Sequence, residues 1–374
     1  MHDAKGRSDT AGEGGAGTPE ASTTPGRIGF IGRLVSWKTA ALGWLSFGAG
    51  HLLRALLLIW ATLAIYFSNL PWAWARVSLA VIFAAFGIWT LWVSRKRGMR
   101  WAFAPAFVGV LVWFILIPPS HDRPWRPEFA VMPRAYIDGD RVRITGLRNF
   151  KYRSRHDFDV RYEEREFSLA AVESLDLYIS YWKPGPVAHT FVSFNFDDGS
   201  PPFCVSIEVR PEIGEGFAPL ASAFKQFELM YVVGDEHDLV GSRASHRNEE
   251  VFLYRIVAAP EGVRLLLQVY LMRINELADR PEWYHLLSNS CTVNIFRYAN
   301  TAGRAGRFDV RHLLNGWVDR YLYAAGRLDT TLPFEELRRR SNITDVAKAA
   351  ADAPDFSERI RANLPKPPRP SAGN

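Results

Sequence analysis

The chain has 374 residues, a formal net charge of +6 and 48% hydrophobic residues. This length is enough for one large core with a membrane anchor, or for two domains. The basic excess is modest, and the second half has no basic run interleaved with aromatic residues, which argues against nucleic-acid binding. The first third is apolar and rich in tryptophan, whereas the rest is a mixed polar chain.

Residues 1–26 are rich in Gly, Ser, Thr and Pro and contain almost nothing that packs in a core. This composition predicts a disordered tail. The tail lacks the positive, apolar and small-residue plan of a secretory signal peptide. Residues 28–50 mix Trp and Leu with Arg, Lys and Gly. This second segment fits either an interfacial amphipathic helix or a further weak membrane span, and the sequence leaves both open.

Three apolar segments follow and predict transmembrane helices at about residues 52–70, 77–93 and 101–118. Each has about 17 to 19 residues, which is at the short end of what crosses about 30 Å of hydrocarbon. Buried helices of a soluble domain are the alternative. Three such segments in a row, flanked by Trp and Arg, favour a membrane region, which we assign to residues 27–119.

The loop charges predict the orientation of these helices. Basic residues precede the first span and recur between the second and third at Arg95–Arg97 and Arg100, whereas the loop at 71–76 is aromatic and nearly uncharged. The positive-inside rule therefore predicts a cytoplasmic N-terminus. Three spans then place the chain from about residue 120 onward outside. The expected location is a multi-pass protein of the bacterial inner membrane with its C-terminal domain in the periplasm.

Residues 120–330 are predicted to form an α+β domain of catalytic type, followed by a C-terminal extension at 331–374 with a disordered, Pro-rich end. Alternating apolar residues and turn signals predict the strands. The expected strands are 142–144, 147–152, 158–162, 175–182, 189–196, 203–210, 229–233 and 251–256. The expected helices are 261–278, one that begins at Cys291, and 310–325, with a mixture of loop and helix at 216–227.

Two residues carry the chemistry that we predict. His189 opens the strand at 189–196, and Cys291 opens a helix after Asn289 and Ser290. A thiol becomes a strong nucleophile only as a thiolate, and a helix N-terminus and a nearby imidazole both lower its pKa. We therefore predict Cys291 as the nucleophile and His189 as the general base. Each residue alone is a weak signal, because single histidines and free cysteines are often core residues.

The residues around this pair suggest the rest of the site. Pairing of strands 189–196 and 203–210 about Gly199 places His189 opposite the neighbourhood of Glu208 and Arg210. A carboxylate beside an imidazole orients it, so we predict Glu208 in that role, with Ser206 as second choice. A structural ion pair of Glu208 with Arg210 is the alternative. Asn289 and the amides of the helix N-terminus are predicted to form an oxyanion hole.

The remaining patterns predict no cofactor and no metal. The sequence has neither His-x-x-x-His nor Cys-x-x-Cys spacing, and no phosphate-cradling glycine pattern. The charged turn at 235–238 is interpreted as a solvated loop, with binding of a cation as the alternative. Cys204 is the only other cysteine, and a Cys204–Cys291 disulfide remains an alternative that would abolish thiolate chemistry.

Several short motifs in this order and spacing resemble the Lnb N-terminal periplasmic domain family over residues 121–330. The matching segments are 148–153, 189–196, Asp198–Gly199, 206–210 with Glu212, 231–236, 273–277, 281–284 and 289–292. The resemblance implies a role in bacterial lipoprotein maturation, as a lipoprotein N-acyltransferase that depends on a cysteine and a histidine. The family's cysteine and histidine match Cys291 and His189.

The order of histidine before cysteine is also similar to permuted papain-like enzymes, which implies that fold for the domain. The expected function is acyl transfer from a phospholipid to the N-terminal amine of a lipoprotein through a thioester. The expected partners are therefore phospholipid, lipoprotein substrates and the bilayer. A periplasmic cysteine peptidase or amidase, and a non-catalytic envelope-assembly protein, remain as alternatives.

Overall fold

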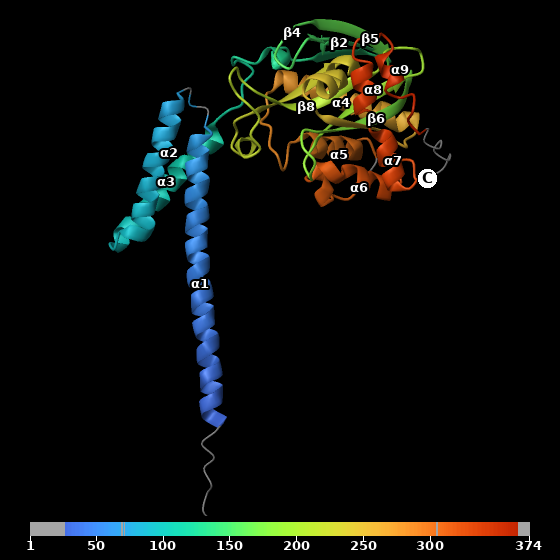
Figure 1. Cartoon of the computed structure of the whole chain (residues 1–374). Helices are drawn as coiled ribbons and strands as arrows, with labels where there is room; N and C mark the ends of the chain where they lie inside the picture. The colour runs from blue at the N-terminus through green and yellow to red at the C-terminus, as the bar shows by residue number, and fades with distance from the viewer. Residues whose placement is uncertain (1–26, 69, 71, 304–305, 366–374) are drawn as a thin grey trace, which may run out of the picture. The chain divides into compact units, whose positions relative to one another are not determined.

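The computed structural model describes residues 27–68, 70, 72–303 and 306–365. The tails expected at 1–26 and at the extreme C-terminus lie outside these residues. Three apolar helices precede a sheet-containing domain, so the α+β class expected from the sequence is confirmed (Figure 1). The described residues up to Trp60 and those from Ala61 onward form two compact units, and the division falls within the first helix.

The apolar helices have the length and composition needed to cross a membrane. They are α1 (Arg27–Tyr66), α2 (Ala73–Ile88), continued by the π-helical turn η1 (Trp89–Val93), and α3 (Arg97–Leu116). Their candidate spans are Phe47–Tyr66, Ala73–Val93 and Gly98–Leu116, with mean hydropathies of 1.6, 1.8 and 1.8. Large apolar side chains point outward, including Trp101 at 77% exposure and Leu116 at 71%. Such exposure suits a lipid environment and not water.

The segment at 28–50 belongs to the same continuous helix as the first span. α1 runs for 40 residues without a break, so residues 28–50 form no separate helix. The first predicted span, 52–70, ends earlier than expected, because α1 stops at Tyr66. The second and third spans lie where the sequence placed them to within a few residues.

The domain is built on one large sheet with a small two-stranded sheet beside it. The strands are β1 (Arg134–Asp138), β2 (Arg141–Arg148), β3 (Lys151–Tyr152), β4 (Phe158–Asp159), β5 (Tyr162–Ser168), β6 (Val172–Tyr181), β7 (His189–Phe196), β8 (Phe203–Arg210), β9 (Glu228–Gly234) and β10 (Glu250–Arg255). The large sheet has the order β1-β2-β9-β8-β7-β6-β10, and β5 pairs with β2. Its neighbours are antiparallel except at a short parallel junction between β2 and β9.

That junction requires glycine at position 234. A Cβ on Gly234 would lie 2.6 Å from the carbonyl oxygen of Arg148 on β2. No side chain fits at that distance, because real Cβ contacts are longer. The close approach lets the Asp235 amide donate to the same carbonyl at 3.2 Å and turns the chain into the next element.

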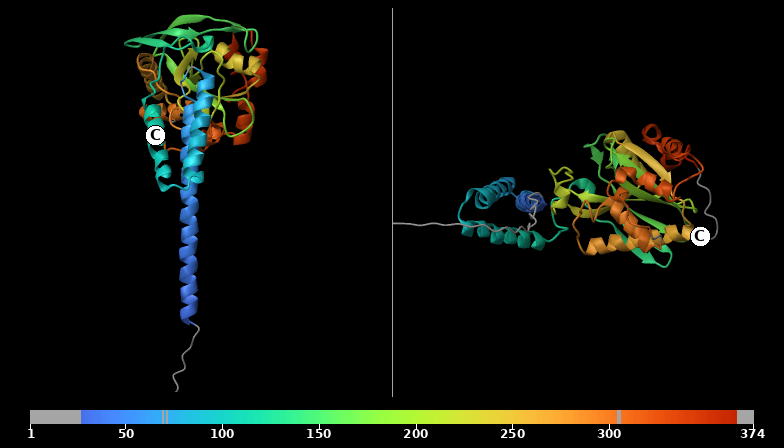
Figure 2. Two further views of the ribbon diagram at one scale, coloured as in Figure 1. Left: turned by 90° about the vertical axis from the view of Figure 1, so that its left-hand side faces the viewer. Right: turned by 90° about the horizontal axis from the view of Figure 1, so that it is seen from below.

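Helices cover both faces of the sheet, as the right-hand view of Figure 2 shows. On one face lie α4 (Pro260–Asp279) and α5 (Cys291–Thr301), and on the other the π-helix η4 (His237–His246) and α8 (Thr344–Ala349). The central strand β7 is therefore buried on both sides, with Val192 in one core cluster and Phe191 in the other.

The remaining helical elements are short. They are the 3-10 turns η2 (Pro127–Phe129), η3 (Ala221–Ala223), η5 (Val310–His312) and η6 (Asn315–Trp317), and the helices α6 (Val318–Ala324), α7 (Phe334–Ser341) and α9 (Phe356–Arg359). The prediction of one helix over 310–325 is wrong, since the segment breaks at η6. A Cβ on Gly316 would lie 2.5 Å from the Gly185 carbonyl oxygen, so the chain must leave the helical path to bring these backbones together.

The segment expected to be a C-terminal extension packs on the sheet. Ile343, Ala347, Phe356 and Ile360 lie in the core cluster on the η4 face. Arg361 donates to Glu236 Oε2 at 2.6 Å and to Asp176 Oδ2 at 2.9 Å. The packed domain thus continues past the predicted boundary at residue 330.

Candidate active site

Cys291 is the first residue of α5, a helix of 11 residues. Its N-cap, Ser290, is extended (φ −107°, ψ 174°) and makes no side-chain cap. The Ser290 side chain therefore accepts from none of the first backbone N–H groups of the helix. The positive end of the helix dipole favours a negative charge at this place. The local structure around Cys291 is thus suited to a thiolate, as the sequence predicted for a helix start.

His189 begins β7, where the strand pairs with β8 in the register expected from the sequence. Phe191 lies opposite Ser206, and continuing this antiparallel register by two residues places His189 opposite Glu208. The imidazole Nε2 lies 2.7 Å from Ser206 Oγ and 3.1 Å from Glu208 Oε1. Ser206 Oγ also donates to Glu208 Oε1 at 2.7 Å. Both residues proposed for orienting the histidine therefore contact the same ring nitrogen, Nε2.

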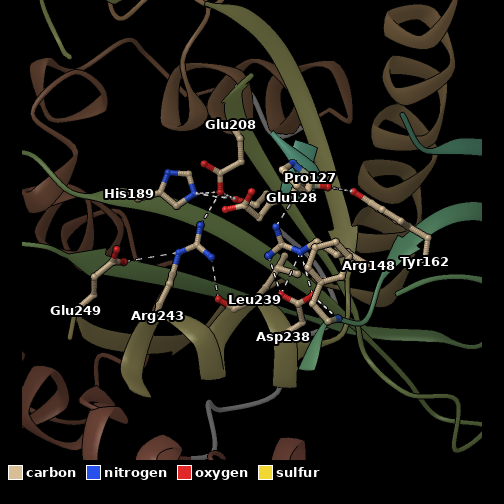
Figure 3. A network of polar contacts seen from close by, with 12 residues as sticks. Pro127, Glu128, Arg148, Tyr162, His189, Glu208, Asp238, Leu239, Arg243 and Glu249 are labelled. Carbon is tan, nitrogen blue, oxygen red and sulfur yellow. Dashed lines mark hydrogen bonds and ion pairs between the residues drawn. The ribbon is translucent and has the colours of Figure 1, made fainter. Parts of the chain in front are cut away.

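A buried arginine holds the carboxylate in place. Arg243 of η4 donates to Glu208 Oε1 at 2.5 Å and to the Leu239 carbonyl at 2.8 Å, and its Nε lies 3.8 Å from Glu249 (Figure 3). The guanidinium also stacks over Phe191, 4.7 Å from the ring centroid. Burial on its own raises the pKa of Glu208, but the charges of His189 and Arg243 hold that pKa well below its usual value. Glu208 is thus ionised beside the imidazole.

The alternative pairing of Glu208 with Arg210 does not form. Arg210 instead donates to the carbonyl oxygens of Phe129 and Ala130, both at 2.9 Å, and stacks over Trp125. Figure 3 also shows a second buried ion pair close by, in which Arg148 binds Asp238 at 2.7 Å. This pair fixes β2 to η4, the element that supplies Arg243.

The thiol and the imidazole are hydrogen-bonded to each other. Burial raises the pKa of Cys291, but the hydrogen bond and charge of His189, with donors from Thr190, outweigh burial and lower that pKa to about 6. Burial lowers the pKa of His189, but Glu208 and the thiolate outweigh it and raise that pKa to about 9. Between these two values the favoured state is a thiolate–imidazolium ion pair.

Other donors surround the sulfur. The Asn315 side-chain amide lies 3.6 Å from Cys291 Sγ, and its oxygen accepts from the Ala188 backbone N–H at 2.8 Å. The Tyr284 hydroxyl accepts from the Cys291 backbone N–H, and burial together with the thiolate raises the pKa of Tyr284, which keeps it protonated. Thr190 donates to the sulfur from its backbone and its hydroxyl. These groups provide the hydrogen-bond donors that an oxyanion at this place needs.

Asn289 has a different set of contacts from those predicted. Its amide donates to Glu282 Oε2 at 3.3 Å and to the Trp283 carbonyl at 2.9 Å, and its oxygen accepts from Asn294 at 2.9 Å. Both amide hydrogens are thus engaged in holding the loop before α5. The geometry favours Asn315 and Tyr284 over Asn289 as donors to an oxyanion.

The two cysteines are free, and the disulfide alternative is wrong for this structure. Cys204 lies in the core cluster on the η4 face of the sheet, whereas Cys291 lies in the cluster on the α5 face. The sheet therefore separates the two sulfur atoms. Burial raises the pKa of Cys204 well above its usual value, so this thiol stays protonated.

Sequence reasoning missed Arg243 and Asn315. Arg243 follows the acidic turn at 235–238, which we interpreted as a solvated loop. That interpretation is wrong, because Glu236 and Asp238 are buried and ion-paired with arginines. Asn315 lies in the predicted helix at 310–325. It forms an Asn-Gly pair with Gly316, and this turn signal could have indicated the break in that helix. Among the residues that the structure describes, no three His, Cys, Asp or Glu side chains are placed to hold a metal ion.

Residues 158–316 match the model of the Lnb N-terminal periplasmic domain. Over these residues the chain is similar to that family. No curated protein and no solved structure matches the chain. The Lnb N-terminal periplasmic domain begins at β4 and ends at Gly316, so it contains His189, Glu208, Cys291 and Asn315. With the three apolar helices before it, the domain is the periplasmic part of a membrane-anchored protein.

Proposed function

We propose that this protein is a membrane-anchored, cysteine-dependent acyltransferase of the periplasm. The observation that carries the proposal is the buried Cys291–His189–Glu208 array at the start of α5, in which an imidazolium stabilises a thiolate. A strand histidine that precedes a helix-start cysteine supports a permuted papain-like arrangement of the site. The donor is a phospholipid, and the acceptor is the N-terminal amine of a lipoprotein.

The first half of the reaction forms a thioester. The Cys291 thiolate attacks the ester carbonyl carbon of the lipid, forming an S–C bond, while donors at the start of α5 stabilise the oxyanion. The C–O bond to glycerol then breaks, and the His189 imidazolium gives its proton to the leaving oxygen, which departs as a lysophospholipid. Glu208 keeps the ring oriented throughout.

The second half transfers the acyl chain. The acceptor amine attacks the thioester carbonyl, His189 takes the amine proton, and the C–S bond breaks to restore the thiolate with an amide as product. The oxyanion is held a second time by the same donors. The reaction is therefore ping-pong, and the enzyme ends in the state in which it began.

Contacts between the domain and the membrane helices support a lipid donor over a soluble one. Lys225, in the loop between β8 and β9, donates to the carbonyl oxygens of Phe114 and Ile115 at the end of α3, at 2.9 and 3.1 Å. The neighbouring Phe224 stacks on Phe67, just after α1, at 5.7 Å. Holding the domain at the ends of membrane helices keeps its site near lipid esters, and such proximity lowers the barrier by several kcal/mol.

The same loop presents apolar side chains to its surroundings. Ile213, Phe217 and Leu220 are exposed at 68%, 47% and 54%. Exposed apolar residues that continue from membrane helices fit contact with lipid. The proposed orientation, with a cytoplasmic N-terminus and three spans, places this loop at the outer leaflet.

A transfer assay separates acyl transfer from the competing thiol hydrolase, which would act as a peptidase or amidase. The full-length protein is incubated with radiolabelled phosphatidylethanolamine and a diacylated lipopeptide with a free N-terminal amine. We expect label in the N-acylated lipopeptide with the wild-type protein and with Cys204→Ala, and none with Cys291→Ala. Release of labelled free fatty acid alone supports the hydrolase, and label transfer by Cys291→Ala contradicts both.

A further inference from the structure

An apolar cavity of about 300 Å³ lies beside the candidate nucleophile, on the α5 face of the sheet. Its wall comes from β6, β7, α4, α5 and α6. Most of the wall is aliphatic or aromatic, including Leu175, Val192, Leu266, Ile295 and Leu322. A cavity of this volume is within the range that binds small ligands, and its apolar wall favours a hydrocarbon.

Two threonines connect the cavity to the thiol. Thr190 and Thr292 both line it, and their hydroxyls are hydrogen-bonded at 2.7 Å. Thr190 also donates to the Cys291 sulfur, and Thr292 Oγ1 lies 3.8 Å from that sulfur. The sulfur and the cavity are therefore separated by a wall one residue thick. An acyl group on Cys291 reaches the cavity by passing this threonine pair.

The helix itself gives the cavity a direction. Ile295, Ala299 and Ala302 line the cavity and follow Cys291 at intervals of four, four and three residues, which places them on one face of α5. From Cys291 to Ala302 the chain rises about 16 Å. The hydrocarbon core of a bilayer is roughly 30 Å thick, and one phospholipid acyl chain spans about half of it. The rise from Cys291 to Ala302 therefore matches the depth of one acyl chain.

The polar groups in the wall do not favour a charged ligand. Asn300 exchanges two hydrogen bonds with the Gly306 backbone, at 2.9 and 3.4 Å. Burial lowers the pKa of His312, which keeps its ring neutral. Its Nδ1 accepts from the Asp309 N–H at 2.9 Å, so the proton lies on Nε2. Among the described lining residues, only Arg327 is then charged.

We propose that this cavity binds the acyl chain carried by Cys291, that the chain runs along the Ile295–Ala299–Ala302 face of α5, and that the small side chain of Ala299 sets the chain length accepted. The inference rests on the proposed function, because it assigns a subsite to the same thioester. It adds the substrate class: a single long, unbranched hydrocarbon chain. A peptide substituent does not match this cavity, because most of its wall is apolar.

The test fills the cavity from α5. Ala299→Trp places a large ring across the path of the chain, and Thr301→Trp adds the same ring at an exposed position at the end of the same helix. Each full-length protein is mixed with dihexanoyl, didecanoyl or dipalmitoyl phosphatidylethanolamine in mixed micelles, and the acyl adduct on Cys291 is measured by intact mass. We expect Ala299→Trp to lower the ratio of dipalmitoyl to dihexanoyl adduct by about tenfold or more. Thr301→Trp should keep the wild-type ratio.

A binding measurement separates the cavity from the chemistry. In the Cys291→Ala background, binding of the fluorescent fatty acid parinaric acid is compared with and without Ala299→Trp. Weaker binding with Ala299→Trp supports the cavity even if the wild type forms no thioester, in which case only the proposed function fails. An unchanged chain-length ratio together with unchanged parinaric acid binding overturns the inference. If Ala299→Trp loses its cooperative melting transition, Ala299→Leu takes its place, with the same shift expected at smaller size.

Discussion

Replacing His189 with glutamine should move the pH at which Cys291 becomes reactive. The imidazole lowers the pKa of the thiol to about 6 against an ordinary value of 9.0, while burial acts in the opposite direction. Without the imidazole the pKa should therefore return to 9 or above. At pH 6 about half of the wild-type thiol is ionised, whereas a thiol of pKa 9 is ionised to about one part in a thousand.

Intrinsic reactivity partly offsets this loss. A thiolate of higher pKa is a better nucleophile, with a Brønsted slope of about 0.4 to 0.5, so three units make each thiolate about 15 to 30 times more reactive. The net result for His189→Gln is a rate of alkylation about 15 to 30 times lower at pH 6. The same arithmetic makes the two proteins react equally at about pH 7.5 to 7.8 and makes the variant faster at higher pH.

The assay is the rate of iodoacetamide labelling of the full-length protein from pH 5 to 10, followed by mass. Cys291→Ala defines the background, which should be near zero because the Cys204 thiol is buried and stays protonated. His156→Gln removes an exposed histidine and should leave the wild-type profile unchanged. A His189→Gln profile that still has its midpoint near pH 6 would refute the assignment of the thiolate to this imidazole.

Three further changes test other parts of the structure. Glu208→Gln should lower the pKa of His189 from about 9 toward 6.5, so the upper limb of the pH–rate profile for acyl transfer should move to lower pH. Glu249 contacts only the arginine of this array, so Glu249→Gln should leave that limb in place. Gly316→Ala should destabilise the protein by about 1–3 kcal/mol in chemical denaturation, because its Cβ would meet backbone at 2.5 Å. Gly241→Ala, whose Cβ would meet only Phe356 at 3.7 Å, is the matched control, and equal unfolding free energies would contradict the packing argument. Lys225→Met should reduce acylation by phospholipid in proteoliposomes but not by a soluble activated ester, and a parallel loss with both donors would point to general misfolding.

The sequence predicted the strand pair of the candidate site closely. β7 and β8 have the bounds expected from their alternation and from the Gly199 turn, and the expected pairing placed His189 opposite the neighbourhood of Glu208 and Arg210. The start of α5 at Cys291 was also expected, because the polar Asn-Ser approach precedes an apolar helical pattern. Local signals were sufficient in these places because turn geometry and side-chain alternation determine the structure there.

Other features depend on contacts between distant segments. Arg243 faces Glu208 only because η4 crosses the sheet, and Asn315 reaches the sulfur only because Gly316 allows its backbone to approach that of Gly185. The buried carboxylates at 235–238 resemble a solvated turn in sequence, since their partners Arg148 and Arg361 lie far away in the chain. No local pattern contains this information. The sequence analysis therefore assigned the oxyanion-hole role to Asn289, the side-chain amide nearest to Cys291 in the sequence.

The most direct test of the account is the mass of the intact full-length protein after incubation with phosphatidylethanolamine of defined acyl chains, without an acceptor. The account predicts one added acyl group that neutral hydroxylamine removes, that peptide mapping assigns to Cys291 and that is lost in Cys291→Ala. An unmodified wild-type protein, or an acyl group attached elsewhere, would contradict it.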